Sequence, residues 1–395
     1  MKMLAINCGS SSVKFKLFQV DNGTYRVLAA GLVEKIAEES SLVHMQWQGG
    51  VTEQNNRVAS HREALEIIEM MLLDTKIVPD FSQLDVIVHR VVHGGEKFYQ
   101  PVVINDEVTQ TIKSLTPLAP LHNPFNLEGI MVLREKAPQV KQVAIFDTAF
   151  HQTMPEVSYL YPLPDDFYRS KNVRRYGFHG ISHSYLAKTA SHFLDKPLDT
   201  LHIVSLHLGN GASATAVKNG RSIDTSMGMT PLEGLVMGTR CGDVDPGILI
   251  YLEREYDLDS EKIDEILNAQ SGLRGICGEN DMREILKRIK KGDKKAKLAF
   301  DIFCNRIKKY IGAYAALLGR LDVLVFSGGI GAGSPDVRER VCEGLGLLGI
   351  QLDLDVNKRL NADIGCIDDG SKDVRVLTVA TDEELEMVKQ AYMVQ

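Results

Sequence analysis

A short polar turn near the start of the chain, residues 7–14, carries side chains that could hold a phosphate group. It follows the apolar run 3–6 and leads into the alternating run 15–18, so it is expected to join two strands. Gly9 lets backbone N–H groups approach an anion, while three serines and Lys14 add hydroxyl donors and a positive charge. Turns of this composition also occur where a chain only reverses direction, so a second observation is required.

A second turn of this kind lies in the middle of the chain. Residues 203–208 read as a strand, residues 209–213 as a turn of small residues and residues 214–217 as an alternating segment. The strand-like run 84–89 is likewise echoed at 321–326, and a double glycine follows each. Similar elements offset by roughly 200 to 240 residues predict a duplicated α/β chain with a cleft between the copies. Strand-then-glycine is also common in unrelated α/β proteins.

Length and composition predict a two-domain globular protein. The 395 residues are too many for one ordinary core, and 44% hydrophobic with 25% charged residues is typical of soluble enzymes. A net charge of -7 without a long basic run argues against nucleic-acid binding. The six cysteines contain no Cys-x-x-Cys pair, which indicates neither a zinc site nor a disulfide framework. We expect a cytoplasmic protein without membrane contact, because the sequence has no signal-peptide core and no membrane-spanning apolar run.

Helical periodicity predicts helices at residues 61–73, 123–133 and 298–318, and a final helix that begins near residue 381. Asn123 is expected to cap the second of these helices, and Thr381 with Glu384 to form a capping box at the last. The apolar run 143–146 predicts a buried strand that ends at Asp147, where open α/β sheets place functional groups.

Seven motifs are similar, in sequence and in order, to those of the acetate kinase family, and the resemblance covers the chain from its first strand to its last helix. They are residues 7–14, 89–95 (His-Arg-Val-Val-His-Gly-Gly), 146–151 (Phe-Asp-Thr-Ala-Phe-His), 175–180 (Arg-Tyr-Gly-Phe-His-Gly), 207–211 (His-Leu-Gly-Asn-Gly), 237–243 (Met-Gly-Thr-Arg-Cys-Gly-Asp) and 326–331 (Phe-Ser-Gly-Gly-Ile-Gly).

This resemblance implies the duplicated actin-like (ribonuclease H-like) α/β fold of the sugar kinase and heat-shock ATPase superfamily, with a nucleotide cleft between two domains. An N-terminal domain would comprise residues 1–150 joined by the C-terminal helix of about residues 384–395, and a nucleotide-binding domain residues 151–383. The resemblance also implies a homodimer. The implied reaction is reversible, magnesium-dependent, direct in-line transfer of the γ-phosphoryl group of ATP to acetate, giving acetyl phosphate and ADP.

Two arginines are the candidates for the charge that such a reaction needs. Transfer of a phosphoryl group to a carboxylate brings two anions together, so the site requires cations that stay charged when desolvated. Arg90 and Arg240 each lie beside a strand end or a glycine-rich loop. The alternative is that either arginine only pairs with an internal acid such as Asp243 or Glu233.

Asp147, His179 and His122 complete the catalytic candidates. A carboxylate acceptor has no proton to lose, so Asp147 is expected to orient Arg90 or hold metal-bound water rather than to act as a base; the alternative is a helix cap. His179 lies in a turn before a predicted helix, where it suits a donor to the transferring phosphoryl group. Either histidine could instead be a packed turn residue. The resemblance favours a functional role, more for His179 than for His122, and no phosphohistidine is required.

For the metal, the family pattern points to Asn7 and Glu383. Magnesium, with manganese as the alternative, needs only one or two protein oxygens beside the nucleotide phosphates. Glu384 is expected to serve the helix cap, which leaves Glu383 for the metal; compensation of the helix dipole is the alternative for Glu383.

Within the N-terminal turn, Ser10 and Ser12 are assigned to phosphoryl oxygens and Lys14 to charge balance. Ser11 is expected to matter least, because it should point the opposite way along an extended segment.

The nucleotide is expected to contact three segments, which are His207, Leu208, Gly209, Asn210 and Gly211, then Asp281, Met282 and Arg283, and finally Gly328, Gly329, Ile330 and Gly331. The family usually continues Gly-Gly-Ile-Gly with a glutamate and an asparagine, whereas this chain has Ala332 and Gly333. This difference leaves nucleotide selectivity open. ATP is the first choice, and pyrophosphate or another nucleoside triphosphate is the alternative.

Four residues, Val92, Leu121, Phe178 and Pro231, match the family's pocket for the acetate methyl group. Valine rather than alanine at position 92 leaves little room, which predicts that propionate is a substrate poorer by ~10 to 200-fold.

A different class of function is a nucleotide-gated binding module of the heat-shock ATPase kind. That function predicts a separate partner-binding domain, for which the two halves leave no room.

Overall fold

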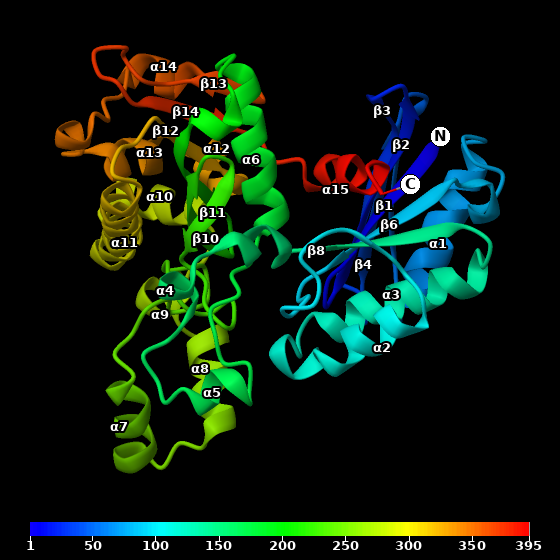
Figure 1. Cartoon of the computed structure of the whole chain (residues 1–395), viewed down its shortest axis with the longest axis horizontal. Coiled ribbons are helices and arrows are strands. Elements are labelled where there is room, and N and C mark those ends of the chain that lie inside the picture. Colours follow the sequence, from blue (N-terminus) through cyan, green and yellow to red (C-terminus); the bar gives the residue numbers. More distant parts are fainter. Residues whose placement is uncertain (395) are drawn as a thin grey trace. The chain divides into compact units, whose positions relative to one another are not determined.

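The computed structural model describes residues 1–394, which form two compact units. Unit 1 comprises Met1–Ala149 together with the residues from Asp382 onward, and unit 2 comprises Phe150–Thr381. Each unit is built on one mixed β-sheet with helices packed on it (Figure 1). Within the described part of the chain, no helix has both the length and the apolar character that crossing a membrane requires.

The sheet of unit 1 has the strand order β5-β4-β3-β2-β1-β6-β8-β7. Its strands are β1 (Lys2–Cys8), β2 (Ser12–Asp21), β3 (Thr24–Glu34), β4 (Ser41–Trp47), β5 (Gly50–Asn56), β6 (Val86–Val91), β7 (Val102–Val103) and β8 (Lys141–Phe146). β1 pairs antiparallel with β2 and parallel with β6, and β6 pairs parallel with β8. The parallel centre is therefore flanked by an antiparallel meander.

Helices cover both faces of this sheet. They are α1 (His61–Asp74), α2 (Asp106–Ser114), α3 (Asn123–Lys136) and α15 (Glu383–Tyr392), with short 3-10 turns at Phe81–Gln83 and Thr116–Leu118. α1 and α3 pack on one face, where Leu4, Ile6 and Phe15 enter the core. α15 packs on β1, β6 and β8. Because side chains alternate along a strand, the residues between those core positions face α15.

The sheet of unit 2 has the order β11-β10-β9-β12-β14-β13. Its strands are β9 (His202–Leu208), β10 (Ala212–Lys218), β11 (Arg221–Thr225), β12 (Val323–Ser327), β13 (Ile364–Cys366) and β14 (Arg375–Val379). β9 pairs antiparallel with β10 and parallel with β12, and β12 pairs parallel with β14. The segment β11-β10-β9-β12-β14 thus repeats β3-β2-β1-β6-β8 of unit 1.

The helices of unit 2 are α4 (Glu156–Tyr159), α5 (Asp166–Arg169), α6 (Gly180–Phe193), α7 (Gly247–Tyr256), α8 (Ser260–Ala269), α9 (Gly272–Cys277), α10 (Met282–Lys290), α11 (Lys294–Leu318), α12 (Gly328–Gly333), α13 (Pro335–Cys342) and α14 (Leu354–Arg359), with 3-10 turns at Ala149–Thr153, Leu198–Thr200 and Gly346–Leu348. α6 packs on β9, β12 and β14, as α15 does on the corresponding strands of unit 1. α11 packs on β10 and β9. The expected duplicated α/β fold is confirmed, as are the predicted helices around residues 61–73, 123–133 and 298–318.

Candidate active site

Polar side chains of unit 1 gather at one end of its central strands, on the face that α15 covers. Asn7 lies next to the end of β1 and pairs in register with Lys14 of β2. Arg90 lies next to the end of β6, and Asp147 directly follows β8. Strand alternation sets this arrangement, because the neighbours of Asn7 on β1, Ile6 and Cys8, are buried in the opposite core.

Arg90 is held by two of these groups. Its Nε and Nη2 donate to the two oxygens of Asp147 over 3.1 and 2.5 Å, and its Nη1 donates to Asn7 Oδ1 over 3.1 Å. The Asp147 side chain is 1% exposed. Burial alone would lower the pKa of Arg90, but the carboxylates of Asp147 and Glu383 raise it above its ordinary value. Asp147 therefore fixes the orientation of a permanently charged guanidinium.

The start of α15 differs from the predicted capping box. Asp382 is the N-cap and accepts from Leu385 N over 3.0 Å, so the pairing of Thr381 with Glu384 is wrong. The helix begins one residue later than that box requires, and the short carboxylate of Asp382 takes the free N–H. Glu384 instead forms an ion pair with Lys14, with Oε1 and Nζ 2.8 Å apart.

Glu383 lies among these charges. Burial raises the pKa of its carboxyl group, Arg90 lowers it, and Asp147 and Glu384 raise it further. The cluster of Lys14, Arg90, Asp147, Glu383 and Glu384 holds three acids and two bases, so it has one negative charge in excess when all are ionised. Such a carboxylate would be stabilised by a cation.

Two asparagines and a threonine hold the loop after β6, a role that the sequence did not indicate for any of them. Asn126 accepts from Val92 N over 3.0 Å and donates to Cys8 O over 2.7 Å. Asn123 accepts from His93 N and donates to its carbonyl oxygen. Thr148 Oγ1 accepts from Gly94 N over 3.1 Å. Asn123 therefore does not cap α3, because both ends of its amide are used by a segment distant in sequence.

The N-terminal turn is tighter than predicted. β1 ends at Cys8 and β2 begins at Ser12, with Gly9 N donating to Ser12 O over 2.8 Å. Ser10 and Ser11 are both exposed within the turn itself. The expectation that strand alternation turns Ser11 away is therefore wrong, because Ser11 is not part of an extended segment.

In unit 2 the equivalent strand ends carry imidazoles and hydroxyls. His207, next to the end of β9, pairs in register with Ser213 of β10. His179 precedes α6 in a left-handed conformation (φ 57°), and its ring stacks on His207 with centroids 4.4 Å apart. His207 Nδ1 and Ser182 Oγ are 2.8 Å apart, as are His179 Nδ1 and Ser213 Oγ. The two rings are thus each anchored through Nδ1.

Arg240 lies beside the same glycine-rich loop, and no acid of residues 1–394 pairs with it. Its Nη1 approaches only Pro231 O (3.3 Å) and Met237 Sδ (3.9 Å) among the described residues, and burial lowers the pKa of its guanidinium. A Cβ built on Gly211 would lie 3.6 Å from both Arg240 Nη1 and His179 Nε2, so these two groups converge on this glycine. A half-buried cation that has no acidic partner among the described residues, beside a glycine-rich loop, suits an anionic ligand.

The acids proposed as alternative partners of Arg240 are occupied elsewhere. Glu233 pairs with Arg175, with Nη2 and Oε1 2.6 Å apart. Asp243 accepts from Tyr310 over 2.9 Å and lies 3.4 Å from Arg306. The alternative reading of Arg240 as an internal ion-pair residue is therefore wrong.

The three predicted nucleotide segments meet at a cavity of about 560 Å³ in unit 2. It is lined by Gly209, Asn210, Asn280, Asp281, Met282, Arg283, Leu286, Gly329, Ile330, Gly333, Ser334, Pro335 and Asp336. Asp281 caps α10 and pairs with Arg283 at 2.6 Å, which lowers the pKa of Asp281 to about 2. Gly328 (φ 76°) admits no side chain, because a Cβ there would lie 2.4 Å from Leu208 O.

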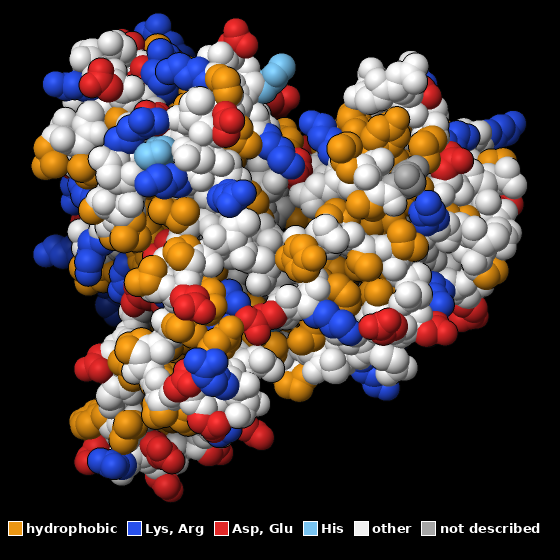
Figure 2. All heavy atoms as spheres, in the orientation of Figure 1, with side chains coloured by type: hydrophobic (Ala, Val, Ile, Leu, Met, Phe, Trp, Pro, Cys, Tyr) orange, Lys and Arg blue, Asp and Glu red, His pale blue; other side chains and the backbone are white. Residues whose placement is uncertain are grey.

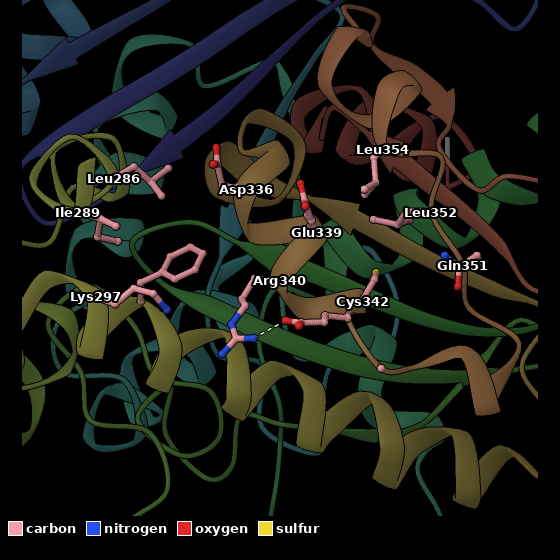
Figure 3. A pocket seen from close by; sticks show the side chains of 13 residues that line it. Leu286, Ile289, Lys297, Asp336, Glu339, Arg340, Cys342, Gln351, Leu352 and Leu354 are labelled. Carbon is pink, nitrogen blue, oxygen red and sulfur yellow. Dashed lines mark hydrogen bonds and ion pairs between the residues drawn. The ribbon is translucent and has the colours of Figure 1, made fainter. Parts of the chain in front are cut away.

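A larger neighbouring cavity of about 680 Å³ shares Leu286 and Asp336 with the first. Figure 3 shows Leu286 and Ile289 at one side of it and Leu352 and Leu354 at another. The cations that line it, Arg340 and Lys297, both pair with Asp301, and Arg340 also pairs with Glu343. The cations of both cavities are thus neutralised, since Arg283 in the smaller one pairs with Asp281. The smaller cavity is the nucleotide candidate because the three predicted segments line it.

The predicted methyl-pocket residues are divided between the units. Val92 (4% exposed) and Leu121 (58% exposed) belong to unit 1, where His122 lies at the start of α3. Phe178 (2% exposed) and Pro231 belong to unit 2. The Pro231 carbonyl accepts from Arg240, which ties this loop to the unpaired cation.

Comparisons with known proteins agree with this layout. The sequence profile of the acetokinase family matches residues 2–389. The acetate kinase of Sulfurovum sp. (strain NBC37-1) is 50% identical over 395 residues, covering 100% of this chain and 99% of that protein. The structure of Porphyromonas gingivalis acetate kinase has a TM-score of 0.92 at 43% identity, covering 100% and 99% of the two chains. A propionate kinase from Francisella tularensis subsp. tularensis SCHU S4 has the same TM-score at 40% identity and covers 98% of each chain. The chain belongs to the acetokinase family.

Proposed function

We propose that this protein is an acetate kinase that transfers the γ-phosphoryl group of ATP reversibly to acetate, giving acetyl phosphate and ADP. Family membership and acetate kinase relatives near 50% identity support the reaction class. The observation that carries the site assignment is Arg240, a half-buried cation without an acidic partner among the described residues, beside His179 and Gly211. A transferring phosphoryl group is the anion that would complete it.

The acceptor side belongs to unit 1. Arg90 uses three of its N–H groups on Asp147 and Asn7 and retains two for a carboxylate or phosphoryl oxygen. Asp147 holds the guanidinium in place and takes no proton, because acetate reacts as the carboxylate. Ser10, Ser12 and Lys14 would contact phosphoryl oxygens and balance charge. His122 would be a further hydrogen-bond donor to these oxygens.

The nucleotide side belongs to unit 2. ATP would occupy the cavity of about 560 Å³, with its phosphates toward Gly209 and Asn210 and its nucleoside toward Asp281–Arg283 and Gly329–Ile330. His179 and Arg240 would stabilise the equatorial oxygens during direct in-line transfer, and neither needs to form a covalent bond. Gly333 presents no side chain here, so the base is selected by the cavity's shape and by neighbours such as Asn280.

Magnesium would be held by Glu383 and Asn7. Within the described residues, no group of three or more His, Cys, Asp or Glu side chains is placed to hold a metal ion. Magnesium needs only one or two protein oxygens beside the nucleotide phosphates. A carboxylate with a raised pKa in a cluster of excess negative charge suits a divalent ion. The bound ion would neutralise the β- and γ-phosphate charge. Glu383→Gln should raise the magnesium concentration for half-maximal rate about 10 to 100-fold, in keeping with known losses of metal-site support.

Acetate is proposed as the preferred acceptor, with the methyl group against Val92, Leu121, Phe178 and Pro231. The likeness to a propionate kinase makes this choice a question for measurement. A kcat/KM for propionate equal to that for acetate would contradict it.

We also propose that the chain forms a homodimer. α7 has no buried residue although its sequence is largely apolar, and Ile248, Ile250 and Tyr251 are exposed. Figure 2 shows hydrophobic side chains on the surface of this part of unit 2. A short apolar helix of this kind gains stability by packing against a partner. Ile250→Glu should yield a monomer in light scattering.

The direct test is an acyl-hydroxamate assay with ATP, magnesium and acetate. Acyl phosphate should accumulate in proportion to enzyme and require all three components. ATP hydrolysis that acetate leaves unchanged, with no acyl phosphate, would instead favour the nucleotide-gated binding module.

A further inference from the structure

One buried hydroxyl of unit 2 lies between two histidines. Ser213 Oγ is 2.8 Å from His179 Nδ1 and 2.8 Å from His183 Nε2. The other nitrogen of His183, Nδ1, is 2.8 Å from Ser205 Oγ. Four side chains from α6, its preceding turn and two paired strands therefore form one continuous hydrogen-bonded row, Ser205–His183–Ser213–His179.

Three of the four members, Ser205, His183 and Ser213, are fully shielded from solvent, since each is 0% exposed. Burial, together with the neighbouring His151 and His207, lowers the pKa of His183 well below its ordinary value, so its ring is neutral. A neutral imidazole has one donor and one acceptor nitrogen, and a hydroxyl has one proton. When the Ser213 proton is used within the row, the hydroxyl donates to one ring and accepts from the other, so the row runs in one of two directions and the direction sets the tautomer of His179.

We propose that Ser213, His183 and Ser205 are positioning residues that hold His179 as the tautomer with its proton on Nε2. Each group donates to the next: Ser205 to His183 Nδ1, His183 Nε2–H to Ser213 and Ser213 O–H to His179 Nδ1. The nitrogen that lies toward Gly211 and Arg240 is then an N–H donor. The opposite sense would present a lone pair to the phosphoryl oxygens and repel them.

The charged and titratable groups around the row favour a neutral ring at His179. His207 stacks on His179 with centroids 4.4 Å apart, and its own Nδ1 is anchored by Ser182. His151 lies edge-on to His183 at 5.8 Å and is bound to Ser222 Oγ and Phe178 O. Arg240 is the cation on the Nε2 side of His179. A second positive charge there would be unfavourable, which argues against an imidazolium and leaves the two neutral tautomers of His179.

This inference rests on the proposed role of His179 and can fail separately from it. Ser213→Ala should lower kcat about 10 to 100-fold, less than the ~10² to 10³ expected for loss of a direct oxyanion donor, and leave the KM for ATP within about twofold. Ser213→Thr keeps the hydroxyl and should restore most of the rate. Ser222→Ala removes an equally buried serine–histidine bond outside the row and should leave kcat unchanged.

A second measurement reads the tautomer without turnover. Long-range ¹H–¹⁵N correlation spectra of the nucleotide-free enzyme, assigned with His179→Gln, should show protonated Nε2 and unprotonated Nδ1 for His179. In Ser213→Ala and Ser205→Ala this assignment should change or average between tautomers. An unchanged His179 tautomer in both variants, or protonation at Nδ1 in the wild type, would overturn the inference. Full activity of His179→Gln would instead refute the role of His179 in transfer.

Discussion

The two sheets place very different chemistry at matching positions. In unit 1, Asn7 pairs with Lys14 across β1 and β2, and Arg90 and Asp147 stand at the ends of the next two parallel strands. In unit 2, the corresponding positions are His207 and Ser213 across β9 and β10, followed by Ser327 and Thr381. The strand ends of unit 1 therefore carry charged side chains, whereas those of unit 2 carry imidazole and hydroxyl groups. The duplicated backbone fixes where groups stand, while the side chains decide whether a place suits a cation and a carboxylate or a nucleotide.

The arginines show the same contrast. Arg90 lies at a strand end and is hydrogen-bonded to a buried acid, whereas Arg240 lies in a loop and contacts a carbonyl oxygen and a thioether sulfur. We infer that the first is a cation positioned by the acids of its own cluster. The second has a charge that only a ligand can balance.

Removal of Arg90 should have the largest effect, because activity and stability fall together. Arg90→Ala should lower kcat by about 10³ to 10⁵, as for other arginines at phosphoryl-transfer sites. It should also cost about 3 to 5 kcal/mol of unfolding free energy, because Asp147 stays buried without its partner. Turnover and urea denaturation measure the two losses. Arg90→Ala/Asp147→Asn should recover stability but not activity; recovery of both would show that Arg90 serves only structure.

Arg240→Ala should match that loss of turnover without the loss of stability. No acid among the described residues is left unpaired, and a desolvated charge is removed. The unfolding free energy should stay within about 1 kcal/mol of wild type or rise, as when unpaired buried charges are removed. Denaturation curves beside kcat decide the point. Equal destabilisation by the two arginine variants would break the contrast drawn between them.

Acid should weaken both units, because each buries neutral histidines. Burial lowers the pKa of His89 and of His93 in unit 1 to about 4, and that of His183 in unit 2 falls as well. The unfolded chain binds protons from about pH 6.5, so stability is complete above that pH and is lost as the pH falls toward 4. By pH 5 each such histidine should cost about 2 kcal/mol.

Denaturation at pH 7.5 and pH 5 measures this loss. His89→Gln should reduce the difference between the two pH values by about 2 kcal/mol, the contribution of one histidine. A pH dependence unchanged by His89→Gln would mean that His89 is charged in the folded protein.

The smallest effects are expected from substitutions that change substrate preference, with the carboxylate affected from unit 1 and the nucleotide from unit 2. Val92→Ala should lower the ratio of kcat/KM for acetate over propionate by up to about tenfold, with little change in the KM for ATP. Gly333→Asn, in unit 2, should change the preference among nucleoside triphosphates and leave the carboxylate ratio alone. Steady-state kinetics with paired substrates measure both ratios. A change of nucleotide preference in Val92→Ala would contradict the division of roles.

Sequence patterns predicted those features that depend on neighbours in the chain. Periodicity located α1, α3 and α11, and the echo of 84–89 at 321–326 marked β6 and β12, the matching strands of the duplicated sheets. The capping residue of α15 was misjudged by one position. This is because Thr381 and Asp382 are both good caps, and packing of the helix on β1, β6 and β8 selects between them.

Features that depend on distant partners could not be predicted. Asn123 has the sequence context of a helix cap, but its amide is used by His93, 30 residues away. The lack of an acid beside Arg240 follows from Glu233 and Asp243 being engaged elsewhere. Ser213 was part of a small-residue turn in the sequence, and only the folded sheet shows that its hydroxyl is shared by two rings.

The packing of α15 on the sheet of unit 1 has a consequence for folding during translation. Met387, Val388 and Ala391 of this helix are buried, and the helix packs on strands that are synthesised before unit 2. The 232 residues of Phe150–Thr381 must be translated in between, which takes roughly 10 to 50 s at ~5 to 20 residues per second. During that interval one face of the nascent sheet is bare, and the later segment can fold first. We therefore expect chaperones to bind the N-terminal segment during this interval.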